Sequence, residues 1–197
     1  MKLELLSPAP LVASCDDVLS QRELDDLARR ATDRHWLAGR GVSVRLDETG
    51  LSWHAHRETV PELHEVGDRI DALLGGAFSL RTVRVRCYAQ GQGHPVHGDH
   101  HEIDGDQLLV TAMLCLRAPE GGGATRFARA DLSIAPRRNR LVVWANHLED
   151  GREDPATHHE GEAVEQGEKI VVLFLFYGSI ERVPALRRVI AGQEVNA

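Results

Sequence analysis

The sequence has no long hydrophobic run and no excess of positive charge. Its longest apolar stretch covers residues 170–177, which is too short to span a bilayer. Lysine and arginine together number 23 against 30 acidic residues, and the formal net charge is −7. Because phosphates and anionic lipid surfaces attract basic proteins, we expect neither nucleic acid nor a membrane as a partner. Residues 1–10 carry one lysine and no long apolar run, so we expect no signal peptide there.

Cysteine is also scarce. The three cysteines, Cys15, Cys87 and Cys115, lack the paired spacing of a metal or redox motif. Cys87 and Cys115 lie in strand-like runs, where burial is the expected state of a free thiol. We therefore expect three reduced thiols in a cytoplasmic protein.

The length and composition are those of an ordinary globular domain. The chain has 197 residues, of which 42% are hydrophobic and 27% are charged. No internal repeat, low-complexity tract or linker interrupts it. We expect a single domain over residues 1–197, as a monomer or a homodimer, whose partner is a small-molecule or peptide substrate.

Helical signals lie in the first part of the chain, residues 1–79. A capping box runs from Ser20 to Glu23, and apolar residues follow it at helical spacing. The pattern predicts a second capping box from Thr59 to Glu62, again followed by an apolar stripe. Residues 1–79 are therefore predicted to form mostly helical support.

From residue 80 onward the apolar period changes to two. In the first such run, Val83 and Val85 alternate with Arg84 and Arg86. Three further apolar runs follow, at residues 108–116, 141–145 and 170–177. Because runs that are apolar on both faces are buried on both faces, we expect an α+β domain that is mainly β. Its helices should pack on one side of a sheet sandwich or barrel, with the core and the site in residues 80–178.

Histidines are numerous in this chain, and four of the eleven lie between residues 94 and 101. His97 and Asp99 are one residue apart, so on a strand their side chains share a face. With a distant histidine such as His159 they would form the two-histidine, one-carboxylate set that binds Fe(II). Local sequence leaves alternatives open: His94, His100 and His101 for the first imidazole, Glu102 for the carboxylate, and His147 and His158 for the last imidazole.

The order of the motifs around these residues is more specific than any single motif. Tyr88 precedes His97 by nine residues. The later motifs are a Thr-to-Leu run at 111–116, Gly-Gly-Ala-Thr-Arg-Phe at 122–127, Pro136 with an apolar run at 141–144, and His-Glu-Gly-Glu-Ala-Val-Glu-Gln-Gly-Glu-Lys at 159–169. Over residues 80–178 the chain resembles the prolyl 4-hydroxylase branch of the Fe(II)- and 2-oxoglutarate-dependent dioxygenases.

The resemblance implies a fold, a metal site and a cosubstrate site. The implied fold is the double-stranded β-helix, a jelly-roll core with N-terminal supporting helices. The implied iron ligands are His97, Asp99 and His159. Lys169 is expected to bind the distal carboxylate of 2-oxoglutarate, and Tyr88 to contact the same molecule, because a buried carboxylate needs a cationic partner.

The chain departs from the resembling oxygen-sensing prolyl hydroxylases at one position. There, a tyrosine on the strand after the His-x-Asp motif helps to hold 2-oxoglutarate, whereas residues 113–115 of this chain are Met, Leu and Cys. We therefore expect Thr125 to assist Lys169. Arg86, Arg126 and Trp144 lie near the motif positions and are candidates for substrate contacts, with a structural or surface role as the alternative.

The implied reaction consumes O2 and 2-oxoglutarate, hydroxylates an unactivated C–H and releases succinate and CO2, with ascorbate as the reductant in assays. Related halogenases lack the carboxylate ligand, so the presence of Asp99 favours hydroxylation. No separate peptide-binding domain is evident. The expected substrate is therefore an amino acid, or a prolyl or other peptidyl residue.

Two other classes of function remain open. A zinc hydrolase would carry a helical His-Glu motif, but after His64 and Glu65 the position that needs histidine is Asp68. A non-catalytic, cupin-like protein would bind a metal or a small ligand with the same three residues. Lys169 favours the dioxygenase, because a protein that only binds metal needs no buried cation ten residues after its last ligand.

Overall fold

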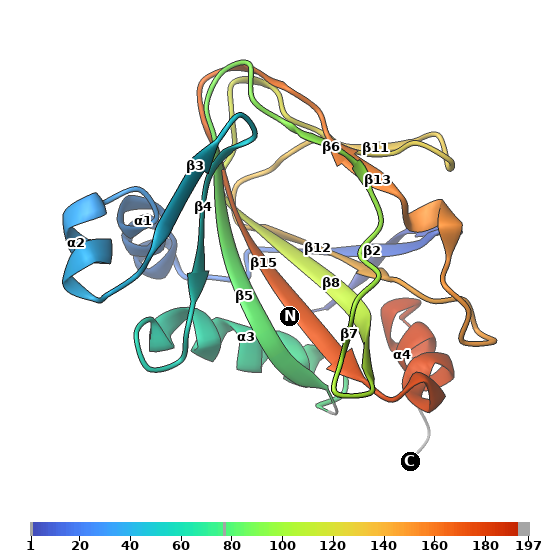
Figure 1. Cartoon of the computed structure of the whole chain (residues 1–197). Helices are drawn as coiled ribbons and strands as arrows, with labels where there is room; N and C mark the ends of the chain where they lie inside the picture. Colours follow the sequence, from blue (N-terminus) through green and yellow to red (C-terminus); the bar gives the residue numbers. More distant parts are fainter. Residues whose placement is uncertain (1, 77, 193–197) are drawn as a thin grey trace.

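The computed structural model describes residues 2–76 and 78–192 (Figure 1). Its largest element is a nine-stranded sheet in the order β1-β2-β12-β8-β15-β5-β4-β3, with β7 paired to β8. The strands are β1 (Glu4–Pro8), β2 (Leu11–Asp16), β3 (Val44–Asp47), β4 (Gly50–Ala55), β5 (Ser79–Tyr88), β7 (Glu102–Ile103), β8 (Asp106–Arg117), β12 (Arg140–Ala145) and β15 (Lys169–Gly178). The three long apolar runs predicted after residue 80 are thus the neighbouring strands β8, β12 and β15, each of them buried along most of its length.

A smaller, four-stranded sheet lies opposite the main sheet (Figure 1). Its order is β11-β10-β13-β6, and its strands are β6 (His94–His97), β10 (Thr125–Phe127), β11 (Leu132–Ile134) and β13 (His159–Gly161). Two short strands, β9 (Gly121–Gly122) and β14 (Val164–Gln166), pair with each other. The predicted mainly β jelly roll is confirmed.

The helices cover the outer face of the main sheet. They are α1 (Gln21–Arg30), α2 (Arg34–Gly39), α3 (Pro61–Leu73) and α4 (Val183–Ile190), with 3-10 turns η1 (Pro155–Thr157) and η2 (Ile180–Arg182). Apolar residues of α1, α3 and α4 share one core with Val83 and Val85 of β5. Because side chains alternate along a strand, Arg84, Arg86 and Tyr88 project from the other face, toward the smaller sheet.

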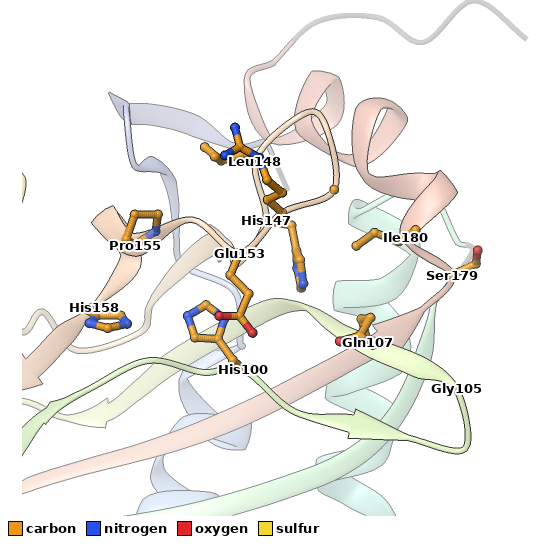
Figure 2. Close-up of a pocket in the computed structure, with 12 residues that line it drawn as sticks. His100, Gly105, Gln107, His147, Leu148, Glu153, Pro155, His158, Ser179 and Ile180 are labelled. Carbon is orange, nitrogen blue, oxygen red and sulfur yellow. The ribbon is translucent and has the colours of Figure 1, made fainter.

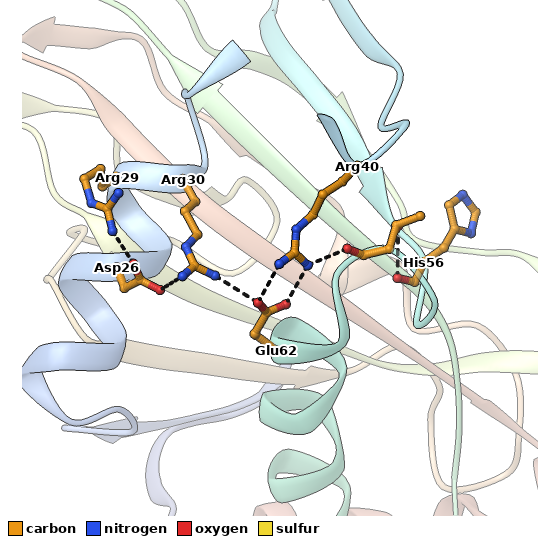
Figure 3. A network of polar contacts seen from close by, with 7 residues as sticks. Asp26, Arg29, Arg30, Arg40, His56 and Glu62 are labelled. Atoms are coloured by element: carbon orange, nitrogen blue, oxygen red, sulfur yellow. Dashed lines mark hydrogen bonds and ion pairs between the residues drawn. The ribbon is translucent and has the colours of Figure 1, made fainter. Parts of the chain in front are cut away.

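Ion pairs join α1 to α3 at the edge of this helical layer (Figure 3). Arg30 contacts Asp26 at 2.7 Å within α1 and Glu62 of α3 at 2.9 Å. Arg40, which follows α2, reaches the same Glu62 carboxylate at 3.3 Å and the carbonyl of Thr59 at 2.7 Å. These shared contacts fix the start of α3 against the two preceding helices.

The prediction of mostly helical support over residues 1–79 is wrong in part. Four strands lie there: β1 and β2 extend the main sheet beyond β12, and β3 and β4 extend it beyond β5. The first capping box is confirmed, since Ser20 and Glu23 cap each other at the start of α1. The second is wrong: α3 starts at Pro61 after Val60, and no side chain caps it. Proline at the first helical position removes one of the unsatisfied N–H groups, and the N–H of Leu63 donates to the carbonyl of Val60 at 3.3 Å.

All three cysteines are free and buried. Burial raises the pKa of Cys87 to about 12 and that of Cys115 to about 11. These two thiols are protonated and unreactive at neutral pH.

No helix in the described residues combines the length and apolarity needed to cross a membrane.

Candidate active site

Two imidazoles and one carboxylate meet between the two sheets. His97 ends β6, His159 begins the antiparallel neighbour β13, and the pairing register places the two opposite each other. Asp99 follows His97 by two residues, and its carboxylate lies 3.6 Å from Nε2 of His97 and 3.9 Å from Nε2 of His159. Within residues 2–76 and 78–192, these three are the one group that brings three ligand atoms within 4.8 Å of one another.

The surroundings orient all three side chains. Nδ1 of His97 lies 2.9 Å from the carbonyl of Pro95, and Nδ1 of His159 lies 3.0 Å from that of Thr157. When Nδ1–H donates to a carbonyl, the lone pair of Nε2 is directed at the shared centre. Burial lowers the pKa of His159, which keeps its imidazole neutral at pH 7. This donor set fits a divalent metal such as Fe(II).

Thr111 and Asn146 support the carboxylate from β8 and from the end of β12. The Thr111 hydroxyl donates to Asp99 at 2.8 Å and accepts from the Asn146 amide at 3.2 Å. Both residues are buried, so this chain of hydrogen bonds is shielded from solvent. Neither residue was predicted as part of the site, because their sequence positions carry only the signal of a buried strand and its end.

Lys169 and Tyr88 face each other on β15 and β5, next to the three ligands. Lys169 is only 4% exposed, and its Nζ lies 5.7 Å from the centre of the Tyr88 ring. The ammonium donates to the carbonyl of Gly123 at 2.7 Å, and no carboxylate of the described residues pairs with it. Burial lowers the pKa of Lys169. A buried cation without a counter-ion is a site for an anionic ligand.

Thr125 lines the same cavity as Lys169 and Tyr88, as the sequence predicts. It starts β10, is buried, and its hydroxyl lies 3.9 Å from the sulfur of Met113, a weak contact that leaves it free to serve a ligand. Gly123, two residues before it, has φ of +73°, a backbone conformation that favours glycine. Its carbonyl accepts the hydrogen bond from Lys169, so this turn helps to position the ammonium.

The three candidates for substrate contacts occupy different places. Arg86 is buried on the inner face of β5 and lines a second cavity beside the ligands. Trp144 is completely buried, and its ring centre lies 4.9 Å from that of His159, so it supports a ligand from behind. Arg126 is half exposed, pairs with Glu160 on the neighbouring strand, and does not line the cavity that holds the ligands.

The alternative histidines lie outside the ligand cluster. His94 is on β6, with its ring centre 4.5 Å from that of His97, and burial together with Arg86 lowers its pKa to about 4. His100, His147 and His158 line a separate pocket with Glu153, whose carboxylate is 3.9 Å from His100 (Figure 2). His101 is exposed, as is Glu102.

A jelly roll with two histidines and one carboxylate between its sheets is typical of the non-haem iron oxygenases. Comparison of the sequence with known families agrees: the profile of the 2OG-Fe(II) oxygenase superfamily matches residues 83–177. The chain is therefore similar to this superfamily over residues 83–177. The predicted cofactors, Fe(II), 2-oxoglutarate and O2, are those of the family.

Relatives of known function lie in the prolyl 4-hydroxylase branch, as predicted. The chain is 27% identical to human prolyl 4-hydroxylase subunit alpha-3 in an alignment that covers 87% of this chain and 34% of that protein. It is 23% identical to prolyl 4-hydroxylase subunit alpha-1 of Caenorhabditis elegans, over 81% of this chain and 31% of that protein. The chain thus spans about a third of the length of these relatives.

Solved structures share the fold. A viral collagen prolyl hydroxylase from Paramecium Bursaria Chlorella virus-1, in a 2OG complex, matches with a TM-score of 0.71 and 22% identity, over 85% of this chain and 96% of that one. The carbocyclase SnoK of nogalamycin biosynthesis matches with a TM-score of 0.58 and 16% identity, over 94% of this chain and 89% of that one. Since neighbours with this fold differ in activity, the fold alone does not define the substrate.

Proposed function

We propose that this protein is an Fe(II)- and 2-oxoglutarate-dependent dioxygenase that hydroxylates an unactivated C–H of an amino acid or of a prolyl or other peptidyl residue. One observation carries the proposal: the buried ammonium of Lys169 has no anionic partner among the described residues and lies in the same cavity as the three ligands. A metal-binding protein without a cosubstrate has no use for such a cation, whereas a dicarboxylate that also binds the metal needs one.

Each residue then has a defined task. His97, Asp99 and His159 would hold Fe(II), and Lys169 with Tyr88 and Thr125 would hold 2-oxoglutarate. Bound Fe(II) and 2-oxoglutarate would together activate O2. One oxygen atom of O2 would enter the substrate C–H as hydroxyl, and the other would enter the succinate that forms from 2-oxoglutarate with release of CO2.

The chain's own groups orient the reactants and exclude water. Thr111 holds Asp99 in place, and the buried rings of Phe127 and Trp144 pack against His159. A carboxylate at the third ligand position favours hydroxylation.

The partner of the protein is a small-molecule or peptide substrate. Its cytoplasmic location and its monomeric or homodimeric state stay predictions.

The geometry does not favour the two alternatives. The possible zinc motif starts at His64, which is buried in α3 with Nε2 3.0 Å from the carbonyl of Ala55. Asp68, where that motif needs histidine, pairs with Arg57 at 2.7 Å. In a cupin-like binder the unpaired ammonium of Lys169 would destabilise the fold without serving a ligand.

Succinate formation tests the proposal. Purified protein with Fe(II), ascorbate and 2-oxoglutarate should release succinate, and the rate should rise with the correct substrate. A screen of amino acids and proline-containing peptides, read as a mass gain of one oxygen, identifies that substrate. Protein that binds one Fe(II) per chain and never forms succinate would instead be a cupin-like binder.

A further inference from the structure

A second cavity, of about 240 Å³, adjoins the cavity that holds Lys169, and Lys169 does not line it. The two cavities share His94, His97, Asp99 and Leu173, so two of the three ligands border both of them. The strand register explains the arrangement: Lys169 is opposite Tyr88, whereas the second cavity lies further along β5, at Arg86 and Arg84. One cavity therefore suits the cosubstrate, and the other suits the substrate.

Two arginines line the second cavity and make it positively charged. Arg84 and Arg86 project from the same face of β5, two residues apart. Arg86 is 7% exposed and Arg84 is half buried, and Nε of each is buried without a hydrogen-bond partner. Arg86 binds only neutral groups, the Thr49 hydroxyl at 2.8 Å and the His94 ring at 3.3 Å. Among the described residues neither guanidinium has an ion-pair partner.

Two nearby acidic groups, Asp99 and Asp47, have other partners. Asp99 is a proposed iron ligand, and Asp47 accepts from Thr49 at 2.6 Å and pairs with Arg45 at 3.0 Å. Arg81, on the same strand but at the surface, shows the contrast, because it pairs with both Asp104 and Asp106. Burial and repulsion from Arg86 lower the pKa of Arg84, so a bound anion would relieve an electrostatic cost.

We propose that Arg84 and Arg86 form a carboxylate clamp, and that the substrate is an amino-acid-sized free acid that presents its α-carboxylate to them. This inference rests on the proposed function and narrows it. An arginine fork binds a carboxylate through two parallel hydrogen bonds, and an internal residue of a peptide has no carboxylate to offer there. A volume of about 240 Å³ is below the roughly 300–1,000 Å³ of pockets for drug-sized ligands, so it suits a small acid.

An α-carboxylate has two sources, a free amino acid or the C-terminus of a peptide, and the test separates them. The iron-loaded wild-type enzyme is assayed with the twenty proteinogenic amino acids, with their carboxamides, and with glycyl dipeptides that carry each residue at the C-terminus. We expect at least one free acid to raise succinate release and to gain one oxygen. Its carboxamide should have a kcat/KM lower by about 30-fold or more, the loss expected when a buried charge has no partner.

Variants test the clamp itself. Arg84→Gln should raise the KM for the active acid by about 30-fold or more. Arg84→Lys keeps the charge without the fork, so its KM for the acid should lie between those of the wild type and of Arg84→Gln. Arg81→Gln removes the same charge from the same strand but outside the cavity, so its KM for the acid should equal that of the wild type.

Clear outcomes overturn the clamp. They are a carboxamide as active as its acid, an Arg84→Gln enzyme with an unchanged KM for the acid, or an enzyme that forms succinate and responds to neither a free acid nor a glycyl dipeptide. A response to the glycyl dipeptides alone would overturn the free-acid substrate and assign the carboxylate to a peptide end. The proposed function fails separately, if the wild type forms no succinate under any condition. In that case the unfolding temperature tests the clamp: a rise with one of the free acids but not with its carboxamide would support it, and no rise with any acid would overturn it.

Discussion

Lys169 is one of only two lysines in a chain with 23 basic residues, and it is almost completely buried. Replacing it by alanine removes the proposed partner of the distal carboxylate of 2-oxoglutarate. We expect weaker 2-oxoglutarate binding by roughly 2–5 kcal/mol, the usual cost of removing one member of a buried charge pair. The KM for 2-oxoglutarate in succinate formation measures this. Lys2→Ala is the matched control at an exposed lysine, and an unchanged KM in Lys169→Ala would exclude the assigned role.

His158 and His159 are neighbours in sequence and separate in space. His159 joins the ligand cluster, and His158 lines the pocket shared with His100 and His147. We expect His159→Ala to lose both iron and turnover, and His158→Ala to keep both. Iron content after anaerobic reconstitution and desalting measures the first, and succinate release the second. Loss of iron in His158→Ala alone would mean that the adjacent imidazole is the ligand.

Most residues of the candidate site were predicted through the resemblance to the prolyl 4-hydroxylase branch, because local spacing alone left several histidines open. In the structure Asp99 lies just beyond the end of β6, and His159 lies on the strand that pairs with β6. Arg84 was not predicted, because only the tertiary structure shows that a guanidinium is buried without an acidic partner. The place of Arg126 could not be predicted either, since its partner Glu160 lies on a strand 34 residues away.

At the scale of elements, α3 packs closely against the sheet at a glycine. A Cβ at Gly67 would lie 2.2 Å from a methyl of Leu80 and 3.2 Å from the ring of Phe174. Overpacking of this kind costs about 1–3 kcal/mol, and it opposes the helix-propensity gain of about 1 kcal/mol from glycine to alanine. We expect Gly67→Ala to lower the free energy of unfolding.

Gly39, at the end of α2, is the matched control because a Cβ at this position would meet no neighbouring atom within 4 Å. Gly39→Ala should leave stability unchanged or raise it. Urea unfolding of both variants measures the difference, which we expect to be about 1–3 kcal/mol in favour of Gly39→Ala. Equal stabilities would show that α3 moves away from the sheet at little cost.

The strands before residue 79 show why sequence periodicity failed in that part of the chain. Five of the six residues of β2 are buried, so the strand has no alternation of polar and apolar residues. The strand is short, and its pairing partner β12 lies more than a hundred residues later. Periods of two or 3.6 arise only where the two faces of an element meet different surroundings. The faces of β5 meet the apolar core and a polar cavity, and those of α1 meet the core and solvent, whereas β2 lacks such a contrast.

At the scale of the whole molecule, Asp16 ties the N-terminal strands to the centre of the chain. Its carboxylate accepts from Arg140 of β12 at 2.7 and 2.8 Å and from Arg137 at 2.8 Å. The hydrogen bonds from Arg140 are the largest cause of a lowered pKa of Asp16. A network that joins segments over 120 residues apart stabilises the closed sheet rather than one element.

This lowered pKa sets the sign of a pH dependence. The folded protein holds Asp16 ionised to lower pH than the unfolded chain, whose aspartates titrate near about 3.9. Its stabilisation is therefore complete above that value and is lost as the pH falls through the lowered folded-state pKa. We expect Asp16→Asn to cost about 1 kcal/mol at pH 7, since the pair is partly exposed, and progressively less toward pH 2. Urea unfolding of the wild type and of Asp16→Asn across this pH range measures how their free energies of unfolding converge.

Asp150→Asn is the control. It removes an exposed carboxylate that pairs with Arg152, two residues away, and it should change stability less at neutral pH. A stability difference between wild type and Asp16→Asn that stayed constant with pH would mean that the ion pair does not join β2 to β12 in solution.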